Sequence, residues 1–256
     1  NENIQTLNNA IINPAATQTT KSEWGLVSYF GRINYDYASK YLLSASLRTD
    51  ASSRFGPDNK WAIFPALSAA WRLSNESFME NATTISELKL RASFGTTGNF
   101  NIGDFAYLGR VGFVNYSPNN NLVNGQAPVS FENNMLGWEK TASYNIGLDL
   151  GLIENRVYLS LDAYDKRTTD LLYNVSIPAI TGFTSTISNV GEINNKGIEL
   201  EVMTRNFTGE FEWQTSFNIS HNQNKVVDLG PVDERIYNHS LGMSWILKEG
   251  EPMFSY

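Results

Sequence analysis

Apolar and polar residues alternate along much of the chain. From Leu26 to Tyr37 the odd-numbered positions are apolar or aromatic, with one glycine among them, and the charged residues Arg32 and Asp36 fall at even-numbered positions. Successive side chains of a β-strand point to opposite faces, so this period of two predicts a strand with its charges on one face. The same alternation predicts seven further strands, at residues 41–48, 65–74, 88–94, 141–150, 157–164, 198–205 and 212–220.

The links between the predicted strands alternate in length. The short links are residues 38–40, 151–155 and 206–210, and the longer ones are 50–63, 95–137 and 173–196. The link at 75–87 is intermediate, and a helical turn is expected at 76–81. In an antiparallel up-and-down sheet this alternation gathers the long links at one end, as in outer-membrane β-barrels. No run of about 18 apolar residues is present, so the sequence predicts no transmembrane helix.

A soluble β-sandwich would also alternate, with its apolar face turned inward. Strands of about 9–12 residues favour the membrane barrel, because about 9–11 tilted residues cross a bilayer whereas strands in general average about 5–6. A link as long as 95–137 is also uncommon inside a compact domain. Aromatic residues lie beside the short links, where an interfacial girdle belongs: Tyr35, Tyr37, Tyr41, Trp71, Phe211 and Trp213. The barrel is the favoured interpretation, and the sandwich stays open.

The polar face is rich in small side chains, among them Ser44, Ser46, Ser93 and Ser143. A closed barrel of eight strands fills its interior with side chains, and serines fill it poorly. The eight predicted strands therefore indicate one arc of a wider transmembrane barrel.

Composition and charge exclude several classes of function. The net charge of −7 argues against a nucleic-acid binder, which needs clustered positive charge. The chain has no cysteine, which excludes disulfides, thiolate metal sites and cysteine nucleophiles. Only His221 and His239 are present, so a histidine-rich metal centre is excluded as well. The sequence predicts neither a cofactor nor a metal site.

Four carboxylates on the predicted polar face raise the question of acid–base catalysis. Four arginines share that face with them, so an ion-paired wall facing water is the better interpretation. The eight residues are Asp149, Asp162, Glu199, Glu201, Arg32, Arg48, Arg91 and Arg205. His221 is in phase with apolar neighbours and His239 lies in a polar segment without a strand pattern, so neither is a persuasive general base. The sequence therefore predicts no catalytic residues, and the protein is not expected to be an enzyme.

Four aromatic residues lie in or beside the long links and are the candidate ligand contacts: Phe55, Trp61, Phe131 and Trp138. Exposed aromatic rings stack on sugars, and loops commonly carry binding residues. The same four rings would equally serve to pack the loops together. Both interpretations are open on the sequence alone.

A series of short motifs runs along residues 24–228: SASLRTD at 44–50, SSRFG at 52–56, NKW at 59–61, FP at 64–65, Trp71, LKLRASFGTTGN at 88–99, WEKT at 138–141, NIGLD at 145–149, DAYDK at 162–166, TDLL at 169–172, NVGE at 189–192 and NNKGIE at 194–199. Together and in this order they resemble the barrel of SusC/RagA-like TonB-dependent outer-membrane transporters. The resemblance implies a 22-stranded barrel, of which residues 1–256 would be a partial domain. The plug domain, the TonB-contacting segment and the final strands of the family pattern are expected to lie outside this chain.

The resemblance also implies a function and partners. These are import of oligosaccharides or peptides across the outer membrane, a SusD-like surface lipoprotein capping the loop end, and energy from the TonB complex. An alternative on the same barrel is a surface receptor or adhesin, whose long loops bind a partner without transport. An arc cut from such a barrel has two open edges and an exposed apolar face, so these residues are expected to be stable only with the rest of the polypeptide.

Overall fold

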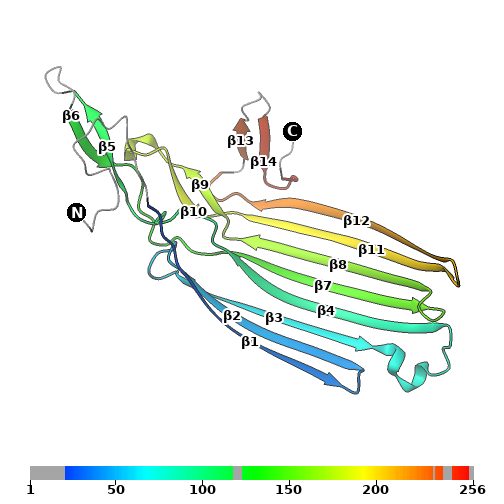
Figure 1. The fold of residues 1–256 in the computed structure, drawn as a ribbon. Coiled ribbons are helices and arrows are strands. Elements are labelled where there is room, and N and C mark those ends of the chain that lie inside the picture. The colour runs from blue at the N-terminus through cyan, green and yellow to red at the C-terminus, as the bar shows by residue number, and fades with distance from the viewer. Residues whose placement is uncertain (1–20, 118–122, 233, 239–243, 254–256) are drawn as a thin grey trace.

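The computed structural model describes residues 21–117, 123–232, 234–238 and 244–253. Its main element is one antiparallel sheet of eight strands in the order β1-β2-β3-β4-β7-β8-β11-β12. The strands are β1 Leu26–Tyr37, β2 Tyr41–Ser52, β3 Trp61–Arg72, β4 Ile85–Asn99, β7 Glu139–Leu152, β8 Val157–Thr169, β11 Glu192–Thr208 and β12 Glu212–Asp228. Each main strand pairs with the next one along the chain, so the predicted up-and-down arrangement of eight strands is confirmed (Figure 1).

The strands have 12–17 residues, and all but β1 are longer than predicted, with most of the added residues at the long-link end. β11, for example, begins at Glu192 instead of residue 198, and its first residues pair with the far end of β12. Asn194, Asn195 and Lys196 are polar on both faces, so the alternation ends there while the backbone hydrogen bonds continue. The links are correspondingly shorter than the sequence suggested.

The remaining long links contain structure of their own. Three two-stranded hairpins stand at this end of the sheet, in Figure 1 opposite the short turns. They are β5 Val111–Tyr116 with β6 Val123–Pro128, β9 Leu172–Ser176 with β10 Ser185–Asn189, and β13 Glu234–Asn238 with β14 Ser244–Lys248. A 3₁₀ turn, η5 Ala179–Thr181, lies between β9 and β10.

The helical turn expected at 76–81 is two 3₁₀ turns instead, η2 Leu73–Asn75 and η3 Ser77–Met79. Glu76 lies between them in an extended conformation, which interrupts any continuous helix. No helix among the described residues is long and apolar enough to span a membrane.

The register of the sheet shows that its strands are staggered. One row of paired residues runs across all eight strands: Tyr37, Tyr41, Trp71, Leu90, Leu148, Leu161, Leu200 and Ile219. The row starts at the last residue of β1 and ends seven residues (219 − 212) into β12. It therefore shifts by about one residue per strand pair. With a rise of about 3.3 Å per residue and a strand spacing of about 4.8 Å, this corresponds to a tilt of about 35°.

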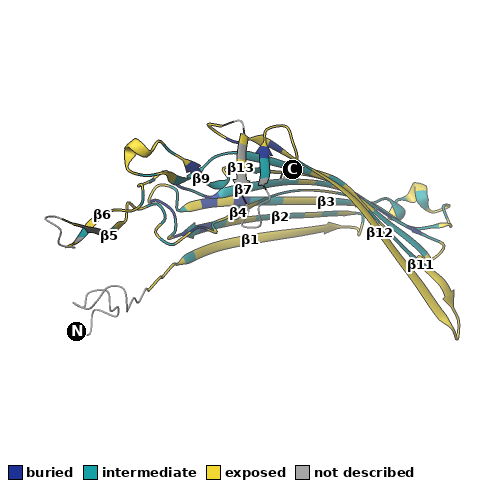
Figure 2. Ribbon diagram, turned by 90° about the horizontal axis from the view of Figure 1, so that it is seen from above, coloured by how far each residue is buried: buried dark blue, intermediate teal, exposed yellow. Residues whose placement is uncertain are grey.

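A tilt of this size is what closing a sheet into a barrel requires. Figure 2 shows the sheet curving along its width, although it does not close within these residues. β1 and β12 form its two edges, and each pairs with only one neighbour in the described part of the chain. The fold is therefore an arc of an antiparallel barrel.

The two faces differ as the sequence predicts. The row from Tyr37 to Ile219 is apolar or aromatic throughout, and Ile33, Leu43 and Leu67 on the same face are all exposed. The small buried cores lie elsewhere, at the loop end. The apolar face therefore does not cover a protein core in this structure.

Two aromatic groups mark the short-turn end of the apolar face. In one, Tyr37 stacks on Tyr41 at 6.4 Å and Tyr41 stacks on Trp71 at 6.2 Å between ring centroids. In the other, Phe207 lies 6.0 Å from Trp213. The predicted clustering of aromatic residues beside the short turns is confirmed.

Candidate functional site

The polar face carries an ion-pair network that spans three strands, β4, β7 and β8. Arg91 on β4 contacts Asp149 on β7 at 2.9 Å through both Nε and Nη2, and reaches beyond it to Asp162 on β8 at 2.9 and 3.1 Å. Lys89 also pairs with Asp149, at 2.7 Å, and the Ser160 hydroxyl donates to the same carboxylate at 3.0 Å. Of the eight residues predicted to form an ion-paired wall, Arg91, Asp149 and Asp162 thus pair with one another, with one arginine binding two carboxylates, and Arg48 pairs with Asp50.

Gly147 makes this reach possible. It lies on β7 directly between Arg91 and Asp162, paired with both across the sheet. A Cβ atom at residue 147 would come within 2.6 Å of the Asp162 carboxylate and 2.7 Å of the Arg91 guanidinium. The glycine therefore leaves the space through which the guanidinium crosses β7.

The acidic residues Glu199 and Glu201 line a hollow next to this network. The hollow has a volume of about 310 Å³ and is also lined by Ser160, Asp162 and Asn218. Carboxylates, hydroxyls and an amide give it a hydrated surface, which suits water or polar ligand groups. No group of three or more His, Cys, Asp or Glu residues in the described part of the chain is arranged to hold a metal ion.

His221 is not part of this wall. His221 pairs with Ile198 and so lies on the apolar face, as its phase in the sequence indicates. His239 lies outside the described residues.

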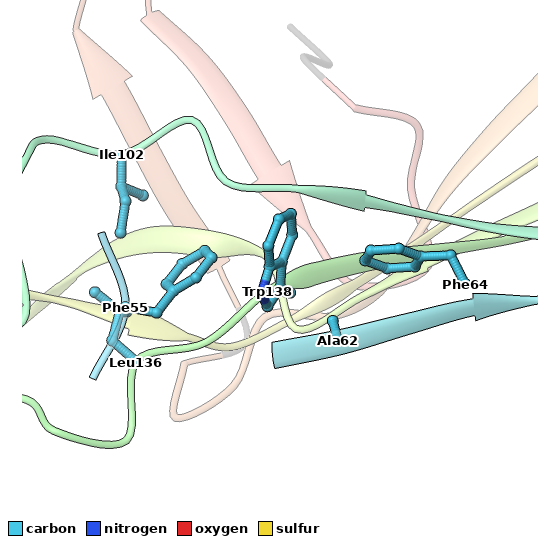
Figure 3. Packing of buried hydrophobic residues seen from close by; sticks show 6 residues of the cluster. All are labelled: Phe55, Ala62, Phe64, Ile102, Leu136 and Trp138. Atoms are coloured by element: carbon cyan, nitrogen blue, oxygen red, sulfur yellow. The ribbon is translucent and has the colours of Figure 1, made fainter. Parts of the chain in front are cut away.

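At the loop end, buried aromatic residues hold the links together. Trp138 contacts the rings of Phe55 and Phe64 at centroid distances of 5.1 and 5.5 Å (Figure 3). It also lies 5.3 Å from the ring of Phe100. Its indole N–H donates to the backbone carbonyl of Lys60 at 2.8 Å. The cluster of buried residues comprises Phe55, Ala62, Phe64, Ile102, Leu136 and Trp138. We call it the loop core.

The four candidate ligand contacts therefore separate into two kinds. Phe55 and Trp138 meet in the loop core and are 0% and 4% exposed. Trp61 is exposed and stacks on Tyr29 at 6.1 Å, on the apolar side of the sheet. Phe131 is exposed beside Phe183, with centroids 5.8 Å apart. The structure brings only the first two into one cluster, and ligand contact by any of the four stays a prediction.

Sequence reasoning missed a second contact in the loops, built on Arg54. The guanidinium lies over the rings of Trp24 and Phe100, at 4.7 and 5.6 Å, and its Nε donates to Asp104 at 2.8 Å. The Ser22 hydroxyl also donates to Asp104, and this hydrogen bond, with Arg54, lowers the pKa of that carboxyl. The residues before β1 are thereby joined to the links after β2 and β4. Only the SSRFG motif around Arg54 pointed to this segment.

At the short-turn end, three donors converge on Glu76. The Lys40 ammonium and the Tyr41 hydroxyl each donate at 2.9 Å, and the Trp71 indole N–H donates at 3.0 Å. These contacts tie the β1–β2 turn to the β3–β4 link. The hydrogen bond from Lys40, followed by those from Trp71 and Tyr41, lowers the pKa of Glu76 from its ordinary 4.5 to about 2.

We expect this junction to weaken in acid. Because the pKa of Glu76 is lower in the folded state, its stabilising contribution is complete above about pH 4.5 and is lost between about pH 4.5 and 2. Unfolding of the full-length protein and of Glu76→Gln, followed by tryptophan fluorescence across this range, measures the effect. The two proteins should differ at neutral pH and converge near pH 2. A difference that persists undiminished at pH 2 would contradict the assignment.

Comparison with known proteins identifies the family. A family model described as "TonB dependent receptor-like, beta-barrel" matches residues 1–250. The chain belongs to the TonB-dependent receptor β-barrel family. It is 44% identical to TonB-dependent receptor P39 of Formosa agariphila over 99% of this chain and 24% of that protein. It is 38% identical to TonB-dependent receptor SusC of Bacteroides thetaiotaomicron over 83% of this chain and 22% of SusC.

Solved structures give the same result for the fold of this receptor segment. The RagAB peptide transporter matches with a TM-score of 0.80 at 27% identity, over 96% of this chain and 28% of the matched chain. The resemblance to the SusC/RagA group predicted from the motifs is thereby confirmed. The chain spans about a quarter of the length of the curated relatives it matches.

Proposed function

We propose that this chain is the part of an outer-membrane transporter barrel that separates the lipid from a water-filled lumen. The observation that carries the proposal is the two-faced, staggered sheet. One face carries the apolar row with aromatic groups at its short-turn end, and the other carries the Arg91–Asp149–Asp162 network. Only a lipid-facing barrel wall accounts for both, because a soluble protein rarely exposes so large an apolar surface. The 256 residues then belong to a barrel domain that closes with further strands of the full-length receptor.

The reaction we propose is import of oligosaccharides or peptides, driven by the TonB complex through parts of the receptor outside these residues. A SusD-like lipoprotein caps the loop end, and substrate binds between the cap and the lumen. Import of this kind is ligand-coupled gating without bond chemistry. The likeness to a peptide transporter supports transport as the function.

An apolar hollow at the loop end favours peptides over oligosaccharides. It has a volume of about 320 Å³ and lies among Leu171, Leu172, Val190, Ile193 and Val226. Ile193 and Val226 pair with each other across β11 and β12. Apolar walls of this kind suit a hydrophobic side chain better than a sugar, whose hydroxyl groups need hydrogen-bonding partners.

Uptake by cells expressing the full-length receptor tests the proposal. We expect labelled peptides to accumulate in intact cells and accumulation to be abolished when TonB is deleted, while surface binding remains. Mass spectrometry of the purified receptor should detect a co-purifying lipoprotein. No TonB-dependent uptake of either peptides or oligosaccharides would contradict transport.

The second candidate is a surface receptor that binds a partner without importing anything. It is favoured by apolar side chains on the outer loops, because Ile180, Met135 and Phe113 are 96%, 80% and 68% exposed. Such exposed groups are typical of an interaction surface. Surface binding with no accumulation inside the cell, with or without TonB, would support this candidate over the transporter.

A further inference from the structure

Charged side chains interrupt the apolar face of the main sheet in one region. Six lie there on the loop-end halves of β7, β8, β11 and β12, in phase with the apolar row: Lys140, Asp165, Arg167, Glu192, Lys196 and Lys225. On β1 to β4 the same face carries no charged residue along the described strands. The sequence did not predict this region, because its residues fall outside the alternating segments. We call Lys140, Arg167, Lys196 and Lys225 the basic patch.

The four cations of the basic patch are neighbours. Lys140 pairs with Thr169, two residues from Arg167 on β8. Arg167 pairs with Asn194, two residues from Lys196 on β11, and Asn194 also pairs with Lys225 on β12. Each cation is therefore diagonal to the next on the adjacent strand, a separation of about 7–8 Å between backbone positions. Together they form a continuous line across four strands.

The height of the basic patch follows from the stagger. The four residues lie 12 (152 − 140), 10 (167 − 157), 12 (208 − 196) and 13 (225 − 212) residues from the short-turn ends of their strands. At about 3.3 Å per residue and a tilt of about 35°, this is about 27–35 Å above those turns. The apolar band of an outer-membrane barrel is about 25 Å tall. The basic patch therefore lies just above the band, at the level of lipid headgroups on the loop side.

The charge of the basic patch is not balanced locally. Arg167 forms an ion pair with Glu192, and the Asn194 amide donates to Asp165. Lys140, Lys196 and Lys225 are exposed, and none has an ion-pair partner within 4.0 Å among the described residues. A third carboxylate, Asp228, pairs with Glu192 across a bulge in β12, so four cations against three carboxylates leave one excess positive charge on a chain of net charge −7. Such a line at headgroup level is complementary to phosphate.

We propose that the basic patch binds a phosphorylated glycolipid of the outer leaflet. The line crosses three strand spacings, about 14 Å, which is wider than a single phosphate can contact. A headgroup that carries two phosphates on a sugar backbone matches this width, whereas a glycerophospholipid presents one phosphate. The inference rests on the membrane placement proposed above and is independent of what the receptor imports.

Lipid retention by the full-length receptor in zwitterionic nanodiscs tests the proposal. The probes are bis-phosphorylated lipid A, its dephosphorylated form and phosphatidylglycerol, and the readout is lipid bound per receptor by native mass spectrometry. We expect the bis-phosphorylated probe to be retained and the dephosphorylated form to be lost. The triple variant Lys140→Gln, Lys196→Gln, Lys225→Gln should retain it roughly a hundredfold more weakly, about fivefold for each lysine.

Two controls make the result specific. Lys166→Gln removes a cation from β8 next to Arg167 but on the opposite face, where its ammonium lies 4.9 Å from the Tyr164 ring, so retention should not change. The triple variant Lys140→Arg, Lys196→Arg, Lys225→Arg should still retain the bis-phosphorylated lipid. It keeps the positive charge, so it separates loss of charge from misfolding. Equal retention by the glutamine triple variant, equal loss with Lys166→Gln, or equal lysine-dependent retention of phosphatidylglycerol would overturn the proposal. Because the assay involves no uptake, its failure is distinguishable from failure of the transport function.

Discussion

Replacing Trp138 with alanine is expected to destabilise the loop end of the full-length receptor by about 3–5 kcal/mol, the usual cost of removing a large buried aromatic side chain. The indole contacts three rings and donates a hydrogen bond to Lys60. Those partners come from the links after β2 and β4 and from β3 itself. The cavity would therefore loosen several links at once.

Hydrogen exchange and urea unfolding would measure this effect. We expect faster amide exchange at residues 53–60 and 133–138 and little change in the middle of β7 and β8. Trp61→Ala is the matched control, because Trp61 is 55% exposed and should cost much less. If Trp138 acts instead as a ligand contact, its removal would weaken substrate binding while exchange and unfolding remain unchanged.

The loop core also shows why aromatic residues in links were difficult to interpret from sequence. Phe55 and Phe131 both lie in long polar links, yet one is fully buried and the other is 45% exposed. The burial of Phe55 depends on residues distant in the sequence. Phe55 packs against Trp138, and Gly98 leaves the space that Trp138 and Phe64 occupy. A Cβ there would lie 2.2 Å from the Phe64 ring and 2.8 Å from the Trp138 indole. No local pattern records such a contact.

Strand prediction succeeded where apolar and polar side chains alternate along the strand. β1 was predicted with both boundaries correct, because the alternation extends from Leu26 to Tyr37. β11 was predicted only from residue 198, because residues 194–196 are polar on both faces while their pairing with β12 continues. Backbone hydrogen bonds hold that part of the strand, and they leave no signature in side-chain polarity. Lys196 and Lys225 of the basic patch lie on this part of β11 and β12.

The charged wall was predictable in kind but not in detail. The alternation placed Arg91, Asp149 and Asp162 on one face, and the structure confirms it. That a single arginine would contact both carboxylates depends on the register of three strands and on Gly147 between them. Register is set by long-range pairing, which a single sequence does not display.

Replacing Leu148 with arginine is expected to destabilise the receptor by about 2–4 kcal/mol, the cost of a cation at the midplane of the lipid-facing surface. Leu148 lies in the middle of β7 and pairs with Leu90 and Leu161 in the apolar row. Asn145→Arg is the control, since Asn145 lies three residues away on the opposite, polar face beside Arg91. We expect the control to cost much less, because an arginine there remains in water.

Urea unfolding of the full-length receptor in lipid vesicles would give both free energies. The comparison tests the orientation of the whole sheet, because the two substitutions introduce the same side chain into the same strand and differ mainly in the face that receives it. A large cost for Leu148→Arg with a small cost for Asn145→Arg places lipid against the apolar row. The reverse order would place the polar face against lipid. Equal costs would mean that both faces are packed against protein, as in a soluble sandwich, and the barrel orientation would then be wrong.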